Sequence, residues 1–187
     1  MSADRPQGDR RQGERLGSRE IYKGRTFGVE VDQVRLPNGK EVEMEIVRHR
    51  GASAVIPLLD DGTVIFVRQY RYATSGWLLE IPAGKLDGGE SPETCARREV
   101  EEEVGYRAGQ LESLGWIWAT PGFADEKIHL FVATGLTPTP QRLEEDEVID
   151  IEKVPLQEAI ELAASGDFHD SKSICALLRL ARRRGEG

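Results

Sequence analysis

Apolar and polar residues alternate along the early part of the chain, and this period of two predicts β-strands. The alternation covers residues 21–47 and is interrupted by Pro-Asn-Gly at residues 37–39, a turn sequence that predicts a hairpin. Residues 1–19 are rich in Arg, Gly, Asp and Gln and nearly free of large apolar side chains, so we expect a disordered tail there. The pattern therefore predicts an N-terminal β segment over residues 20–50.

A second block of strands carries longer apolar runs, which are typical of strands buried on both faces. It comprises residues 52–59 and 63–70, joined by the turn Asp-Asp-Gly at residues 60–62. Further strands are predicted at residues 77–82, 111–118, 127–133 and 148–154. We expect the main domain, residues 51–187, to begin at this block.

Helices are predicted between and after these strands. The first covers residues 92–104, because Ser91 is a favourable N-cap, a proline suits the first helical position and Gly105 supplies a stop. Amphipathic patterns predict two more helices at residues 155–164 and 171–183. Strands interspersed with few helices indicate an α/β domain with a mixed sheet.

Composition and charge exclude several classes of protein. The chain has 187 residues, enough for one principal core, and a formal net charge of −8, which disfavours a general nucleic-acid binder. No apolar run approaches the roughly 18 to 20 residues of a membrane helix, and the polar start of the chain predicts no secretory signal, so we expect a cytoplasmic protein. Cys95 and Cys175 have no CxxC spacing, and we expect both to be buried thiols.

Three glutamates gather on one face of the helix predicted at residues 92–104. Glu99, Glu102 and Glu103 are spaced i, i+3 and i+4, which places their carboxylates along one stripe. Like charges at these spacings repel, so the stripe requires compensation by a cation. Hard divalent cations such as Mg²⁺ bind carboxylates and phosphates, and the stripe is therefore a candidate metal site for phosphate chemistry. A solvated acidic face is the alternative.

The spacing of these glutamates belongs to a longer pattern. The segment from Gly84 to Tyr106 fits G-x5-E-x7-R-E-U-x-E-E-x-G-U, in which U is apolar, and so resembles the signature of the Nudix hydrolases. The matching residues are Gly84, Glu90, Arg98, Glu99, Val100, Glu102, Glu103 and Gly105. Tyr106 is aromatic where the pattern usually has an aliphatic residue. The resemblance implies the Nudix fold, an α/β/α sandwich with a mixed β-sheet, here preceded by a small antiparallel β segment.

The resemblance also implies a metal site. In Nudix hydrolases the glutamates at the positions of Glu99, Glu102 and Glu103 carry the metal ions, and the carbonyl oxygen of Ala83 or Gly84 is a candidate for a further ligand. We therefore expect two or three Mg²⁺ ions per active site, with Mn²⁺ as the alternative ion.

Other positions of the signature are implied to support these ligands. Arg98 is similar to the family arginine that orients a glutamate through a charge-assisted hydrogen bond, and Glu90 resembles the loop glutamate that holds the shape of the motif. Arg98 and Glu102 are therefore candidate catalytic residues as well.

Features outside the signature resemble one branch of the family, the ADP-ribose pyrophosphatases and related nucleotide-sugar hydrolases. This branch has a proline about sixteen residues beyond the last glycine of the signature, and Pro121 occupies that position. The segments RQYRY at 68–72, LEIPAG at 79–84 and PGFADEKIHLF at 121–131 are also similar to it. The resemblance implies hydrolysis of ADP-ribose to AMP and ribose 5-phosphate. The alternatives are a broader specificity for sugar nucleotides such as UDP-glucose or GDP-mannose, or for dinucleotides, and a non-catalytic sensor of ADP-ribose.

The same branch implies substrate contacts, a base and a partner. Arg68 and Arg71 resemble side chains that hold the diphosphate, and Glu80 resembles a substrate-side carboxylate, although each also suits a surface ion pair. The base of this branch lies in an acidic loop, which indicates Glu145 or Glu147 here; an ordinary solvated loop is the alternative. Members form homodimers in which the N-terminal β segment packs over the partner's active site, and we expect the same swapped dimer.

Overall fold

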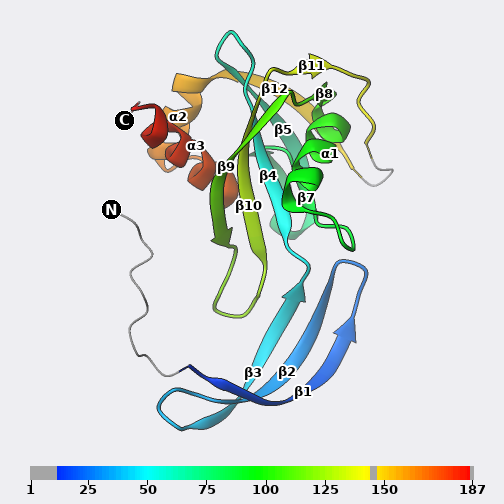
Figure 1. Cartoon of the computed structure of the whole chain (residues 1–187), viewed down its shortest axis with the longest axis vertical. Coiled ribbons are helices and arrows are strands. Elements are labelled where there is room, and N and C mark those ends of the chain that lie inside the picture. The colour runs from blue at the N-terminus through cyan, green and yellow to red at the C-terminus, as the bar shows by residue number, and fades with distance from the viewer. Residues whose placement is uncertain (1–11, 144–146, 186–187) are drawn as a thin grey trace. The chain divides into compact units, whose positions relative to one another are not determined.

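The chain divides into two compact units (Figure 1). The computed structural model describes residues 12–143 and 147–185. The first unit comprises Met1–His49 and Thr120–Glu126, and the second comprises Arg50–Ala119 and Lys127–Gly187. The loop at 120–126 joins the first unit because its backbone pairs with the last strand there: Val47 N–H donates to Phe123 O at 2.7 Å and Asp125 N–H donates to Val47 O at 3.1 Å.

The first unit is built around an antiparallel sheet of β1 (Glu14–Lys23), β2 (Phe27–Arg35) and β3 (Glu41–His49), in that order. The turn between β2 and β3 contains Gly39 at φ 86°, as the Pro-Asn-Gly sequence predicts. The prediction of a disordered tail over residues 1–19 is wrong for residues 14–19, which belong to β1, and residues 1–11 lie outside the described residues. The side chains of β1 are nearly all exposed, so their burial does not hold the strand; its backbone pairing with β2 does.

The second unit contains the remaining strands. They are β4 (Ala52–Pro57), β5 (Thr63–Arg71), β6 (Gly76–Glu80), β7 (Ala83–Lys85), β8 (Tyr106–Arg107), β9 (Gln110–Trp118), β10 (Lys127–Thr134), β11 (Thr137–Pro138) and β12 (Ile149–Pro155), with a 3₁₀ turn at Tyr72–Thr74. One sheet has the order β7-β4-β10-β9, in which β4 and β10 are parallel and the other pairs antiparallel. A second sheet, β12-β5-β6, is antiparallel, and β8 pairs with β11.

Helices cover both faces of these sheets (Figure 1). The helix α1 (Pro92–Val104) packs on a core that includes Val55, Val67 and Phe131, whereas α2 (Leu156–Ser165) and α3 (Ser171–Arg184) pack on the larger core around Ile56 and Phe66. This α/β/α sandwich with a mixed sheet confirms the predicted fold class. The predicted strands and helices of this unit end within two residues of the observed ones.

Two smaller predictions concern membrane spans and thiols. Within the described part of the chain, every helix is too short or too polar to cross a membrane. Both cysteines are free: Cys95 is fully buried on α1, and Cys175 on α3 is only partly buried, so the expectation of a buried thiol is confirmed for Cys95 alone.

Candidate active site

The helix α1 buries part of its acidic stripe. Its N-terminus is capped by the Ser91 side chain, which accepts a hydrogen bond from Thr94 N–H at 3.1 Å, and Gly105 ends the helix at φ 70°. Glu99 is 6% exposed and Glu103 is 2% exposed, because both share the inward face with Ala96 and Val100. The stripe is therefore not an ordinary solvated face.

The loop before α1 is shaped around these carboxylates. A β-carbon at Gly84 would lie 1.7 Å from Glu99 Oε1, so that only glycine leaves room for the Glu99 carboxylate. Ala83 N–H donates to Glu103 Oε2 at 3.0 Å. The short strand β7 and the inward face of α1 thus form one cradle lined by carboxylate oxygens and backbone.

Arg98 is the hub that joins the acidic residues. Its Nη1 donates to Glu99 Oε1 at 2.6 Å and to Glu102 Oε2 at 3.0 Å. Its Nε and Nη2 bind the two oxygens of Glu90, each at 3.1 Å, and lower the pKa of that carboxyl below its ordinary value. The structure therefore brings Arg98, Glu90, Glu99 and Glu102 together, in the arrangement expected for an orienting arginine.

The buried carboxyls of α1 are hard to ionise. Burial raises the pKa of Glu99, and with the charges of Glu102 and Glu147 acting in the same direction and Arg98 opposing them, that pKa is about 7. Burial, together with the charges of Glu99 and Glu147, also raises the pKa of Glu103 well above its ordinary value. When ionised, these carboxylates carry more negative charge than Arg98 compensates.

This arrangement fits a hard divalent cation. Within residues 12–143 and 147–185, no three Asp, Glu, His or Cys side chains converge as a ready-made metal site, and Arg98 binds both Glu99 and Glu102. The donor set nevertheless consists of carboxylate oxygens and backbone, and its excess negative charge lies in a cradle that a single β-carbon would fill. Oxygen donors with uncompensated charge are what Mg²⁺ and Mn²⁺ bind.

Arg71 and Glu80 meet on the same side of the sheet as α1. Arg71 Nε and Nη2 donate to Glu80 Oε1 and Oε2, both at 2.8 Å, in a bidentate pair. Burial opposes ionisation of Glu80, but Arg71 and Lys172 prevail and hold its pKa below the ordinary value. The charges of Arg71 and Glu103 also affect each other's pKa, so the guanidinium lies within electrostatic range of the carboxylate cluster.

Arg68 does not join this group. It pairs with Glu152, with Nη2 3.1 Å from Oε2, and both side chains are more than a third exposed. Successive residues of a strand face opposite sides, and on β5 Phe66 and Val67 belong to different cores. Residues 68 and 71 are three apart, so Arg68 lies on the α2–α3 side, away from Arg71. Because side chains alternate along a strand, the sequence RQYRY already indicated that residues 68 and 71 face opposite sides of the sheet.

The segment that leads into the acidic loop at residues 143–149 is anchored to the end of α1. Thr139 N–H donates to Gly105 O at 2.8 Å, and Arg142 N–H donates to Glu102 O at 3.0 Å. Glu147 is partly buried, and its charge contributes to the raised pKa values of Glu99 and Glu103. Glu145 lies outside the described residues.

Sequence reasoning missed Lys172, which binds Glu80 through Nζ and is only 12% exposed. The signal was a lysine in the first turn of a predicted helix, where the helix dipole disfavours a cation.

Comparisons with known proteins agree on the family. The NUDIX domain profile matches residues 47–177. The ADP-ribose pyrophosphatase of Bacillus subtilis is 40% identical over 164 residues, which cover 87% of this chain and 89% of that protein. A methanol dehydrogenase activator of Bacillus methanolicus is 43% identical with the same coverage, and a GDP-mannose pyrophosphatase of Escherichia coli is 36% identical over 71% of this chain and 78% of its own length.

A solved structure supports the same conclusion. The crystal structure of an ADP compounds hydrolase superposes with a TM-score of 0.80 at 26% identity, and the alignment covers 95% of this chain and 98% of the other. The sequence signature, the carboxylate cradle on α1 and these similarities lead to one assignment: the chain belongs to the NUDIX domain family.

Proposed function

We propose that this protein is a metal-dependent Nudix hydrolase that cleaves the diphosphate linkage of ADP-ribose to AMP and ribose 5-phosphate. One observation carries the proposal. The buried carboxylates of α1 carry more negative charge than Arg98 compensates, and Arg71, which is held by the buried carboxylate of Glu80, lies within electrostatic range of them. Clustered carboxylates suit metal ions, and a guanidinium suits the diphosphate that those ions neutralise. The names of the relatives supply the substrate class.

The metal ligands in this proposal are the carboxylates of Glu99, Glu102 and Glu103 and the carbonyl oxygen of Ala83. Divalent ions bound there supply charge neutralisation of the diphosphate and activation of water. Arg98 holds Glu99 and Glu102 in orientation, and the cradle at Gly84 fixes where Glu99 lies. Mg²⁺ is the proposed ion, Mn²⁺ is the alternative, and two or three ions per site follow the family resemblance.

The other residues act on substrate and proton. Arg71 binds diphosphate oxygens, and Glu80 holds Arg71 rather than the ribose or base. A carboxylate of the acidic loop takes the proton of the attacking water as the phosphoanhydride bond breaks, and Glu145 or Glu147 is that base. Replacement of the base by Gln should lower kcat while substrate still binds, so separate Glu145→Gln and Glu147→Gln variants identify it.

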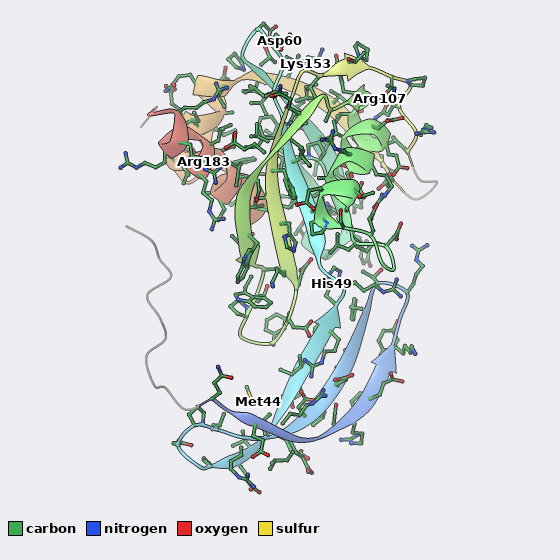
Figure 2. All side chains as sticks on the ribbon, viewed as in Figure 1. Met44, His49, Asp60, Arg107, Lys153 and Arg183 are labelled. Carbon is green, nitrogen blue, oxygen red and sulfur yellow. The ribbon has the colours of Figure 1, made fainter. Side chains whose placement is uncertain are left out.

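We further propose a homodimer with a swapped N-terminal β segment. Both hydrophobic core clusters of the described residues lie in the second unit, so the first unit has no comparable core. Its sheet instead exposes large apolar side chains: Leu16, Ile21, Tyr22, Phe27 and Met44, the last of which is labelled on β3 in Figure 2. A small β unit of this kind gains stability by packing against a partner chain.

A broader sugar-nucleotide specificity is the second candidate, because a GDP-mannose pyrophosphatase is among the relatives. The test is incubation with Mg²⁺ and a panel of ADP-ribose, UDP-glucose, GDP-mannose and diadenosine polyphosphates, with each nucleoside monophosphate quantified. Preferential release of AMP from ADP-ribose supports the main proposal. Equal or faster cleavage of the other sugar nucleotides favours the second candidate, and no cleavage of the panel removes both.

A further inference from the structure

Lys172 is a nearly buried cation that has no role in the reaction proposed above. It is the second residue of α3, and its side chain is 12% exposed. Its Nζ donates to Glu80 Oε2 and, at 2.9 Å, to Asp170 Oδ1. A lysine in the first turn of a helix opposes the helix dipole, so its position there needs local compensation, which these two carboxylates provide.

The start of α3 is fixed to the strand that carries Glu80. Asp170 caps the helix by accepting from Ser173 N–H at 3.1 Å. The Ser173 hydroxyl in turn accepts from Ile81 N–H at 2.8 Å, one residue beyond Glu80. These hydrogen bonds fix the backbone of Lys172 relative to Glu80, so the pair differs from a contact between two mobile surface side chains.

Glu80 connects Lys172 to Arg71. Its side chain is 2% exposed, and its two oxygens receive Nε and Nη2 of Arg71. In the part of the chain that the structure describes, Nη1 of Arg71 has no hydrogen-bond partner, and the guanidinium lies within electrostatic range of Glu103 on α1. The bidentate pair thus fixes the plane of the guanidinium and leaves donors on its other edge.

We infer that Lys172 is a positioning residue that, through Glu80, orients Arg71 to receive the diphosphate of the substrate. The inference rests on the proposed function and adds which residue determines the orientation of the Arg71 guanidinium. Two cations share the Glu80 carboxylate, so Arg71 is not fully neutralised by it and still attracts an anion. Without Lys172, the buried charge of Glu80 falls on Arg71 alone, and the guanidinium is less able to turn its donors and its charge toward phosphate.

Steady-state kinetics with ADP-ribose and Mg²⁺ test this inference. Lys172→Met should raise KM about ten-fold, equivalent to about 1.4 kcal/mol of lost binding, with little change in kcat, because Arg71 binds the diphosphate in the ground state and the transition state alike. Lys172→Arg, which keeps the charge, should restore most of the affinity. Lys153→Met is the matched control, since Lys153 is exposed on β12, contacts Tyr106 and lies near the Asp60 turn in Figure 2.

A merely structural role predicts other results. If Lys172 only stabilised α3, Lys172→Met would lower Tm and leave KM unchanged, and this outcome would overturn the inference. In the double variant Glu80→Gln/Lys172→Met, KM should be no higher than in the worse single variant, because both changes act on the orientation of Arg71. Additive increases in KM would contradict the inference.

Binding of inorganic pyrophosphate in the presence of Mg²⁺, measured by calorimetry, separates this inference from the proposed function. If the wild type binds pyrophosphate and Lys172→Met weakens that binding, the inference stands even for a protein that does not cleave ADP-ribose. If ADP-ribose is cleaved but neither KM nor pyrophosphate binding responds to Lys172→Met, the inference alone fails. If the wild type neither cleaves ADP-ribose nor binds pyrophosphate, both fail.

Discussion

At the scale of single residues, burial determines the chemical character of the glutamates on α1. Glu99 and Glu103 are placed where an isolated negative charge is unfavourable, and one arginine does not compensate for them. A helix gains no stability from such an arrangement. The bound cation in the proposed function would offset this cost.

The first prediction concerns the pH dependence of stability without metal. The folded-state pKa of Glu99 is about 7 and its ordinary value is 4.5, so between these values the folded state binds more protons than the unfolded state. This carboxyl therefore lowers stability as pH rises through that window. In EDTA, Tm of Glu99→Gln relative to wild type should rise from pH 4.5 to pH 7 and then level off. A relative Tm that falls with pH would contradict the assigned environment.

The sequence signature predicted which side chains of α1 and its preceding loop lie close together, but the sequence did not predict the surroundings of isolated charges. The signature fixes types and spacings along one helix, so Glu90, Arg98 and Glu99 come together as expected. Arg68 and Lys172 depend on which face of a sheet or which neighbouring element a side chain meets. Residue type alone does not show which neighbour a side chain meets. The alternation of side chains along a strand, however, would have placed Arg68 and Arg71 on opposite faces.

At the scale of elements, β7 and α1 pack closely around the buried carboxylates. Gly84 belongs to β7, and its missing side chain is the space in which the Glu99 carboxylate lies. The helix is positioned by its caps, which are visible in the sequence: Ser91 and Gly105 predicted both ends of α1 correctly. Strand β1 was missed because its order comes from backbone pairing, to which its exposed side chains contribute no pattern.

The second prediction tests the cradle with two glycines, one in β7 and one in the turn that follows it. Gly84→Ala should abolish most activity because its β-carbon would displace the Glu99 carboxylate. Gly88→Ala is the matched control: nothing lies within 4 Å of the position that its β-carbon would take, so rate and Tm should stay close to wild type. The measurements are kcat for AMP release and Tm for each variant. Equal activity of the two variants would show that the cradle does not position a ligand.

At the scale of the whole molecule, the two units differ in how they are stabilised. The second unit has two hydrophobic cores on either side of its sheets, and its fold class was predictable from strand and helix periodicity. The first unit is a sheet with exposed apolar side chains. Sequence periodicity identified β2 and β3 but not the start of β1. It also does not show what these apolar side chains contact, because alternation does not distinguish another part of the chain from a second copy.

The third prediction addresses the proposed dimer. Sedimentation equilibrium of the wild type should give twice the chain mass of 20.8 kDa. Ile21→Lys introduces a charge at a side chain that is 49% exposed, so it should disturb an interface more than the fold of the chain. This variant should shift toward the monomer mass, whereas Lys40→Met, in the exposed turn of the same unit, should not. A monomeric wild type would exclude the swapped dimer.

The central claim, that the buried carboxylates of α1 serve a metal-dependent hydrolysis and not the stability of the fold, is tested most directly by Glu103→Gln. We expect a loss of kcat for AMP release from ADP-ribose of at least about 100-fold, because even indirect partners of metal ligands cost 10–100-fold. We also expect a higher Tm than wild type at pH 8 in EDTA, since Gln can still accept the Ala83 N–H but carries no buried charge. Near-normal activity, or a large loss of Tm in the metal-free protein, would contradict the claim.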